Sequence, residues 1–383
     1  MSIFGAPPPP PTKLGRYRQL APRAAIHVSP LQLGGMSIGD KWAHLGFGSM
    51  DKESSFELLD AYFDAGGNFI DTATNYQDGS SEEFIGEWAE MRGIRDQLII
   101  STKYSNNFQL GNKDIKQCVN FLGNNLKNLK LSVESSLKRL RTSYIDILYL
   151  HFWDLHTDIE EVMDGLHALV LSGKVLYLGI SDSPSWLVTK ANTYARCMGK
   201  TPFVVYQAAY SVLQRDIERD ILPMCRHEGI ALTFWNVLAQ GHIRSDEEEE
   251  KRRQTGEKGR TSVLGGWERT PDEKKMCDAL QVIANQVGVK SIQAVAIAYT
   301  MHKAPFVFPI IGGRKVEHLH ANIEALDVRL TQNQINYIEG ILPFDKGFPQ
   351  NIIGEYGTYS FLLKSYAHFD EQPILPPITP GSN

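Results

Sequence analysis

The 383-residue sequence contains no apolar run of about twenty residues, so it predicts no membrane-spanning helix. Its few cysteines lack Cys-x-x-Cys spacing, which favours free thiols in a reducing compartment over a disulfide framework. It also lacks an excess of positive charge: the formal net charge of −5 argues against nucleic acid as the main partner. The first twenty residues hold no apolar stretch that could serve as a signal peptide. We therefore expect a soluble, cytoplasmic protein that binds neither nucleic acid nor a membrane.

The sequence does contain a repeated pair of segments, a short apolar run rich in β-branched residues followed by an amphipathic stretch. Strands without polar alternation, each followed by a helix, indicate a parallel sheet covered by helices. Eight such units predict a single (β/α)8 TIM barrel. The alternative, a doubly wound sheet, requires a GxGxxG turn after the first strand, and LGGMSIGDKW lacks that spacing. The eight predicted strands span 28–35, 68–73, 97–103, 144–152, 175–182, 203–210, 230–236 and 306–313.

Three parts of the chain follow from this pattern: a proline-rich arm and lead-in over 1–27, the barrel over 28–342 and a C-terminal extension over 343–383. The stretch 330–342 predicts one extra helix, and the aromatic- and proline-rich tail behind it could drape over a barrel mouth. A dense run of mixed charge at 244–260 has two interpretations. It is a solvated loop or exposed helix, or it is a mobile loop over a ligand.

Four polar residues stand where successive predicted strands end. Asp71 and Tyr76 follow the second strand, Lys103 ends the third and His151 lies at the end of the fourth. In a barrel, the carboxyl ends of the strands face the active site. A tyrosine with a reference pKa near 10 is a poor acid at neutral pH, and a neighbouring ammonium such as that of Lys103 eases the release of its proton. Asp71 would compensate the buried lysine, and His151 can donate a hydrogen bond to a carbonyl oxygen.

Each of these residues alone also has a structural explanation. Asp71 can form a turn, Tyr76 can pack, Lys103 can be solvated and His151 can be a satisfied structural histidine. Their occurrence together at consecutive strand ends favours a proton-donating site.

The motifs around these residues resemble those of a known family. They include GGNFIDTA, SEEFIGEW, TSYIDILYLHFWD, GKVLYLGISD and FPIIGGRKVEHLHANIEAL. From about residue 14 to 342 the chain resembles the aldo-keto reductases, most closely their fungal-type aryl-alcohol dehydrogenase branch. The resemblance implies that Tyr76 is the general acid, that Lys103 and Asp71 tune it, and that His151 orients the carbonyl. It also implies that Asp154 is a structural acid.

The resemblance implies reversible hydride transfer between NADP(H) and an aryl aldehyde or alcohol. Two other functions stay open: an NADPH-binding regulatory subunit of a channel, and a tailoring reductase that acts on an aromatic polyketide ketone. A short proline arm is a poor inactivation segment, which disfavours the channel subunit.

Cofactor contacts are implied at the ends of the later strands. Ser181 and Asp182 occupy the positions of a Ser-Asn pair that holds the nicotinamide carboxamide, and Trp235 either stacks on the nicotinamide or simply packs. Two glycines, Arg314 and Lys315 precede a predicted helix, and this arrangement suits a 2′-phosphate, which favours NADP(H) over NAD(H). The full expected set is Gly35, Met36, Ser181, Asp182, Gln207, Trp235, Asn236, Leu238, Gln240, Gly241, Gly313, Arg314, Lys315, His318 and Asn322.

The substrate pocket is expected to be aromatic. Trp42, Phe152 and Trp153 are the candidates, together with residues of the C-terminal tail, although packing explains each ring equally well. Such a pocket suits a flat aromatic aldehyde. The histidines at 318 and 320 lack acidic or cysteine partners, so we predict no metal site.

Overall fold

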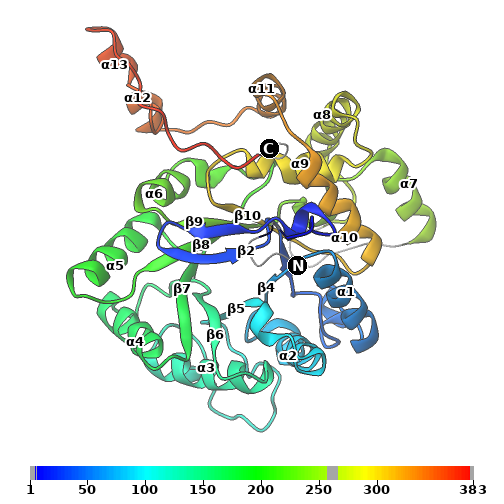
Figure 1. Ribbon diagram of the computed structural model, residues 1–383, viewed down its shortest axis with the longest axis vertical. Coiled ribbons are helices and arrows are strands. Elements are labelled where there is room, and N and C mark those ends of the chain that lie inside the picture. Colours follow the sequence, from blue (N-terminus) through cyan, green and yellow to red (C-terminus); the bar gives the residue numbers. More distant parts are fainter. Residues whose placement is uncertain (1–4, 6, 257–265, 380–383) are drawn as a thin grey trace.

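The computed structural model describes residues 5, 7–256 and 266–379, and a closed barrel of eight parallel strands forms its centre (Figure 1). The order around the barrel is β10-β3-β4-β5-β6-β7-β8-β9, and β10 closes onto β3 by pairing Ile310 with Gln32. This confirms the predicted (β/α)8 architecture. The strands are β3 Gln32–Gly34, β4 Phe69–Asp71, β5 Ile99–Tyr104, β6 Ile145–Leu150, β7 Val175–Ser181, β8 Phe203–Ala209, β9 Ala231–Trp235 and β10 Val307–Ile311.

Helices surround the barrel, and polar side chains mark where several of them begin. Asp51 accepts from the backbone N–H of Ser54 at the start of α1, and Thr270 forms a capping box with Glu273 at the start of α8. The surrounding helices are α1 Lys52–Asp64, α2 Ser80–Arg92, α3 Leu126–Arg139, α4 Ile159–Leu171, α5 Ser185–Cys197, α6 Ile221–Glu228, α7 Asp246–Thr255, α8 Pro271–Val287, α9 Ile292–Met301, α10 Val316–Ile323 and α11 Gln332–Ile341. The helix predicted within 330–342 is α11. None of the helices in the described ranges is both long and apolar enough to cross a membrane.

A hairpin that the sequence did not reveal closes the amino end of the barrel. Its strands are β1 Arg18–Ala21 and β2 Ala24–Val28, drawn in blue across the front of the barrel in Figure 1. Its apolar side chains are buried in one cluster with residues from the barrel strands: Leu20, Ala21, Ala24 and Val28 with Phe69, Ile147, Tyr149, Val205 and Phe308.

The first predicted strand, 28–35, is therefore wrong as a single strand. Val28 ends the hairpin, and the barrel strand begins at Gln32. Pro30 lies between them and has no backbone N–H to donate to a ladder.

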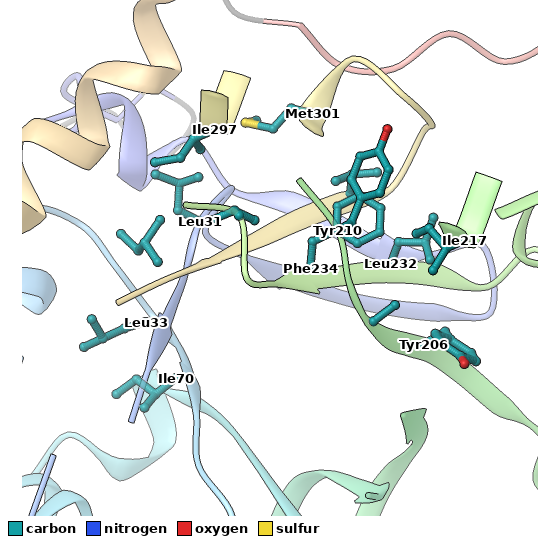
Figure 2. Packing of buried hydrophobic residues seen from close by; sticks show 14 of the residues in the cluster. Leu31, Leu33, Ile70, Tyr206, Tyr210, Ile217, Leu232, Phe234, Ile297 and Met301 are labelled. Carbon is teal, nitrogen blue, oxygen red and sulfur yellow. The ribbon is translucent and has the colours of Figure 1, made fainter. Parts of the chain in front are cut away.

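The sheet is buried on its outer face as well. Figure 2 shows Leu31, Leu33 and Ile70 from the first part of the barrel, and Ile297 and Met301 from α9, in one apolar cluster. In the same view Tyr210 and Phe234 are in contact, with ring centroids 4.7 Å apart and ring planes tilted by 44°. Because the strands are densely packed on both sides, the side chains at their carboxyl ends are held in fixed positions.

The C-terminal tail runs along the outside of the barrel. The guanidinium of Arg219 lies over the ring of Phe344, 4.4 Å from the ring centroid. The short helices α12 Gln350–Ile353 and α13 Phe361–Lys364 project outward (Figure 1). Further on, Tyr356 and Ile374 line a cavity of about 580 Å³ with Pro22 and Phe306. Pro22 joins the two hairpin strands and Phe306 precedes β10, so this cavity lies at the amino end of the barrel. We expected tail residues on the substrate side, and the structure instead places these two at the opposite end.

The run of mixed charge begins as a helix, in line with the first interpretation, because 246–255 form α7. It is not simply solvated. Glu249 is buried and accepts hydrogen bonds from Arg244 (2.6 Å) and Arg269 (2.8 Å). The end of the run, from 257 to 260, lies outside the described residues.

Candidate active site

The carboxyl ends of β4 and β5 bring Asp71 and Lys103 into contact. The Lys103 Nζ lies 2.6 Å from Asp71 Oδ2 and donates a second hydrogen bond to the carbonyl oxygen of Thr72 at 2.7 Å. The other carboxylate oxygen, Oδ1, accepts from Ser101 Oγ at 2.9 Å and from Gln207 Nε2 at 3.1 Å. Both charged side chains are buried, and these bonds satisfy them.

This environment keeps Lys103 charged. Burial lowers the pKa of Lys103, but the Asp71 carboxylate and the Tyr76 hydroxyl raise it, and the net shift is upward. The ammonium lies 4.9 Å from the centre of the Tyr76 ring. A cation is thus held beside the phenol.

Tyr76 stands on a loop that reverses direction sharply before α2. Gln77 and Asp78 adopt left-handed backbone conformations, with φ of 52° and 54°, and Gly79 follows at 98°. The buried Gln77 side chain stabilises this turn: its Nε2 donates to the carbonyl oxygens of Met36 (2.9 Å) and Gly48 (2.8 Å). The tyrosine loop and the loop after β3 are therefore tied to each other.

A second tie comes from α3. Arg139 Nη1 donates to the carbonyl oxygen of Thr74 at 2.8 Å and lies 3.4 Å from the buried carboxylate of Glu82. Glu82 also accepts from Thr102 Oγ1 at 2.7 Å. Burial raises the pKa of Glu82. Arg139 and Glu82 thus connect the strand that carries Lys103 to the loop that carries Tyr76.

His151 completes the group at the end of β6. Its ring centroid lies 6.0 Å from that of Tyr76, edge to face, and its Nδ1 lies 2.9 Å from Asn106 Nδ2. Burial and the charge of Lys103 lower the pKa of His151 to about 3. The imidazole is therefore neutral at physiological pH, so it can donate a hydrogen bond without carrying a charge.

The three aromatic candidates for a substrate pocket differ in their surroundings. Trp42 lies edge-on to Tyr76 with ring centroids 6.2 Å apart, and its Nε1 donates to Asp78 Oδ1 at 2.9 Å. Trp153 is buried and donates to the carbonyl oxygen of Thr157, which fits packing. Phe152 is partly exposed beside His151 in the chain. Trp42 is thus the candidate with direct ring contact to Tyr76.

Asp154 forms a structural cap. It accepts from the backbone N–H groups of Asn124 (2.8 Å), His156 (2.9 Å) and Thr157 (2.8 Å). Burial opposes ionisation, but these hydrogen bonds outweigh it and lower the pKa of Asp154. The geometry agrees with the structural role expected of this residue.

The ends of β7, β8 and β9 bring four expected cofactor residues together. Ser181 is buried, Gln207 points its amide at Asp71, and Trp235 is 36% exposed at the mouth. Trp235 Nε1 lies 3.4 Å from Asp182 Oδ1. Burial raises the pKa of Asp182 to about 6, and its backbone is left-handed at φ 38°.

The loop after β9 carries a buried polar atom without a partner. Asn236 Oδ1 accepts no hydrogen bond from the described residues, although the Nδ2 of the same side chain donates to Gln214 Oε1 at 3.0 Å. Asn236, Gln240 and Gly241 all have positive φ, at 64°, 55° and 95°. An unsatisfied buried acceptor on such a loop fits a ligand contact. Leu238, by contrast, packs against the core.

The loops after β3 and β10 supply the glycines. The backbone N–H of Gly35 donates to the carbonyl oxygen of Asp71 at 2.6 Å, and a Cβ at this position would lie 2.7 Å from that oxygen. At the other loop, Lys315 is the N-cap of α10, and Arg314 lies against Gly48. Gly313 sits close to the Cβ of His318, and the buried Asn322 lies 3.4 Å from the carbonyl oxygen of Gly312. Cation, glycine and helix start therefore meet where an anion was expected.

Several residues of this site carry no sequence signal that we recognised. Thr72 and Ser101 hydrogen-bond to Lys103 and Asp71, and Asn106 contacts His151. Gln77 ties the loop that carries Tyr76 to the carbonyl oxygen of Met36. Thr72 and Ser101 adjoin predicted strand ends, so strand register could have indicated them. Asn106 and Gln77 lie in loops, where no periodic pattern applies.

The barrel and its strand-end site have the form of one enzyme family. The family model of the aldo/keto reductase family matches residues 30–343, so the chain belongs to that family. The chain is 56% identical to a protein of Phanerodontia chrysosporium named aryl-alcohol dehydrogenase (NADP(+)), over 99% of this chain and 100% of that protein. It is 52% identical to aldo-keto reductase ausK of Emericella nidulans, over 92% of this chain and 88% of that protein. It is 48% identical to norsolorinic acid reductase A of Aspergillus parasiticus, over 94% of this chain and 89% of that protein.

Proposed function

We propose that the chain is an NADP(H)-dependent oxidoreductase that interconverts aryl aldehydes and aryl alcohols. The observation that carries the proposal is the charged, buried Lys103 beside Tyr76, with a neutral His151 facing the same ring. The relative named aryl-alcohol dehydrogenase (NADP(+)) supports the substrate class and the cofactor. The ring of Trp42 against Tyr76 supports a flat aromatic substrate.

Tyr76 is the general acid in this proposal. As the aldehyde carbon is reduced, negative charge develops on its oxygen, and Tyr76 donates its phenolic proton there. The Lys103 ammonium favours the phenolate that remains, and Asp71 keeps Lys103 charged. His151 donates a hydrogen bond to the same oxygen while it stays neutral.

The residues at the mouth fit a dinucleotide. Trp235 offers an exposed ring, Asn236 offers an unpaired buried acceptor, and Arg314 and Lys315 offer positive charge at the start of α10. In this proposal Trp235 would contact the nicotinamide, and Arg314 with Lys315 would hold the 2′-phosphate. Bound NADPH supplies the hydride.

Aromatic ketones are a second candidate substrate class, because one relative is named norsolorinic acid reductase A. The chain would then reduce an aromatic ketone with the same residues. A regulatory role that needs only NADPH binding is the third possibility.

One assay separates these possibilities. The purified chain is mixed with NADPH and with benzaldehydes, aliphatic aldehydes or an aryl ketone, and NADPH consumption is followed by absorbance. We expect the benzaldehydes to be reduced fastest. Faster reduction of the ketone would favour the second class. Tight NADPH binding without reduction of any compound would contradict the enzyme proposal.

A further inference from the structure

The amide of Asn106 lies against Nδ1 of His151, which is not the ring nitrogen that faces the substrate oxygen in our proposal. Asn106 Nδ2 is 2.9 Å from His151 Nδ1. With the amide oriented as the structure has it, its NH2 group can only donate, so Nδ1 is the acceptor and carries no proton. A neutral imidazole then has its proton on Nε2, which becomes a hydrogen-bond donor.

The backbone conformation before Asn106 places this amide beside His151. Ser105 adopts φ of 118°, which is strained for a residue with a side chain, directly after β5. Three hydrogen bonds hold it there. Ser105 Oγ accepts from Asn124 Nδ2 at 2.8 Å and from the backbone N–H of His151 at 3.3 Å, and the carbonyl oxygen of Ser105 accepts from the backbone N–H of Gly123 at 2.8 Å.

The same network joins the two loops that carry Asn106 and His151. Asn124 Nδ2 donates to the carbonyl oxygen of Phe152 at 3.0 Å, and Asn124 Oδ1 accepts from the backbone N–H of Asp154 at 2.7 Å. The distance from Asn106 to His151 is therefore fixed by contacts that do not involve either side chain.

The position of the proton on His151 decides whether the ring attracts or repels a substrate oxygen. Lys103 and Tyr76 face the imidazole, and the partner on Nδ1 is a neutral amide rather than a carboxylate. With the proton on Nδ1 instead, Nε2 would present a lone pair to the electron-rich carbonyl oxygen. The ring would then repel the oxygen that it is meant to orient.

We propose that Asn106 is a positioning residue that holds His151 in its Nε2–H tautomer, so that the imidazole presents a donor to the substrate oxygen. The catalytic consequence rests on the function proposed above, but the tautomer itself does not.

The test is Asn106→Asp in the full chain. A carboxylate of the same shape accepts where the amide donates, so the proton of His151 should move to Nδ1. Long-range ¹H–¹⁵N spectra distinguish a bare ring nitrogen from a protonated one, and His151→Gln identifies the signals of this histidine. Asn107→Asp is the matched control, since it introduces the same charge one residue away, where the side chain accepts from the N–H of Gln109.

We expect an unprotonated Nδ1 in the wild type and in Asn107→Asp, and a protonated Nδ1 in Asn106→Asp. If Asn106→Asp does not fold, as judged by circular dichroism, Asn106→Ala is measured instead and should show a mixture of tautomers. A protonated Nδ1 in the wild type, or an unchanged tautomer in the folded variant, would overturn the inference.

Kinetics give the functional readout. Asn106→Asp should lower kcat by about 10²-fold, the scale of losing one donor to a developing oxyanion. The KM for NADPH should stay as in the wild type. An unchanged kcat in a variant whose tautomer has moved would show that the tautomer does not matter for turnover. If the wild type reduces no carbonyl compound, the proposed function fails, while the spectra still decide the tautomer.

Discussion

The two ends of the same barrel are built on opposite principles, and β4 shows both within three residues. Phe69, at its amino end, is fully buried and packs edge to face against Phe308, with centroids 6.1 Å apart. Asp71, at its carboxyl end, is also buried but is surrounded by Lys103, Ser101 and Gln207. The side chain of Phe69 packs among apolar groups, whereas both carboxylate oxygens of Asp71 accept hydrogen bonds.

The difference separates residues that stabilise the fold from residues for which we propose a part in the chemistry. Burying apolar surface contributes about 25 cal/mol per Å², so the hairpin side chains at the amino end are plainly stabilising. A buried ion pair is often no better for stability than an apolar pair of the same size, because both charges lose their hydration. The Lys103–Asp71 pair is therefore better explained by what it does to Tyr76.

The largest effect is expected from removing the cation at the mouth. Lys103→Met takes the ammonium away from Tyr76, so kcat should fall by about 10²–10⁴-fold, the range for general acid catalysis. It also leaves the Asp71 carboxylate buried without its partner, which should lower the free energy of unfolding by about 3–5 kcal/mol. Turnover assays and urea unfolding measure the two effects.

A double variant sharpens this result. Lys103→Met combined with Asp71→Asn removes both charges, so the unfolding free energy should recover most of its loss while kcat stays low. Recovery of activity in the double variant would contradict the tuning role of Lys103.

At the opposite end, an apolar truncation should change stability alone. Phe69→Ala leaves a cavity beneath the hairpin and should lower the free energy of unfolding by about 3–5 kcal/mol. Its kcat and KM, measured well below the melting temperature, should match the wild type. A loss of kcat as large as that of Lys103→Met would break the division between the two ends.

The pH dependence of stability tests the surroundings of His151. Its pKa is lowered to about 3 in the folded chain, against about 6.5 when unfolded, so the unfolded chain binds more protons between those values. The contribution of neutral His151 is therefore complete above about pH 6.5 and is lost as the pH falls towards 3.

The urea midpoint should thus fall more between about pH 7 and about pH 5 in the wild type than in His151→Gln. Equal falls in the two proteins would mean that the imidazole is not held neutral.

The smallest effect is expected from an ion pair of the same chemistry on the surface. Lys52 Nζ lies 2.8 Å from Glu87 Oε1, but the lysine side chain is 48% exposed. Water already solvates both groups, so Lys52→Gln should change the free energy of unfolding by less than about 1 kcal/mol. Urea unfolding beside Lys103→Met makes the comparison, and similar losses at both sites would argue against burial as the deciding factor.

Much of the fold follows from local pattern. Seven of the eight barrel strands could be predicted because each is a short apolar run, whereas the first was merged with the end of the hairpin. The residues at the carboxyl ends could be predicted because a parallel barrel brings those ends together. Asp71, Lys103 and His151 were selected as candidates in this way.

Other features depend on contacts between residues far apart in the chain. The hairpin of β1 and β2 is short, and its register follows from the barrel end that it covers. The path of the tail to the amino end could not be predicted, because it depends on Arg219 and Pro22, which no periodicity connects to it. Asn106 was missed because its partner lies 45 residues away.

The most direct test of the account follows a labelled hydride. Wild type and Tyr76→Phe are given benzaldehyde and NADPH with deuterium at the transferred position, and the alcohol is analysed by mass spectrometry. The account predicts one deuterium on the alcohol carbon in the wild type. It also predicts formation at least about 10²-fold slower in Tyr76→Phe, with an unchanged dissociation constant for NADPH. An alcohol without deuterium, or full-rate transfer in Tyr76→Phe, would contradict it.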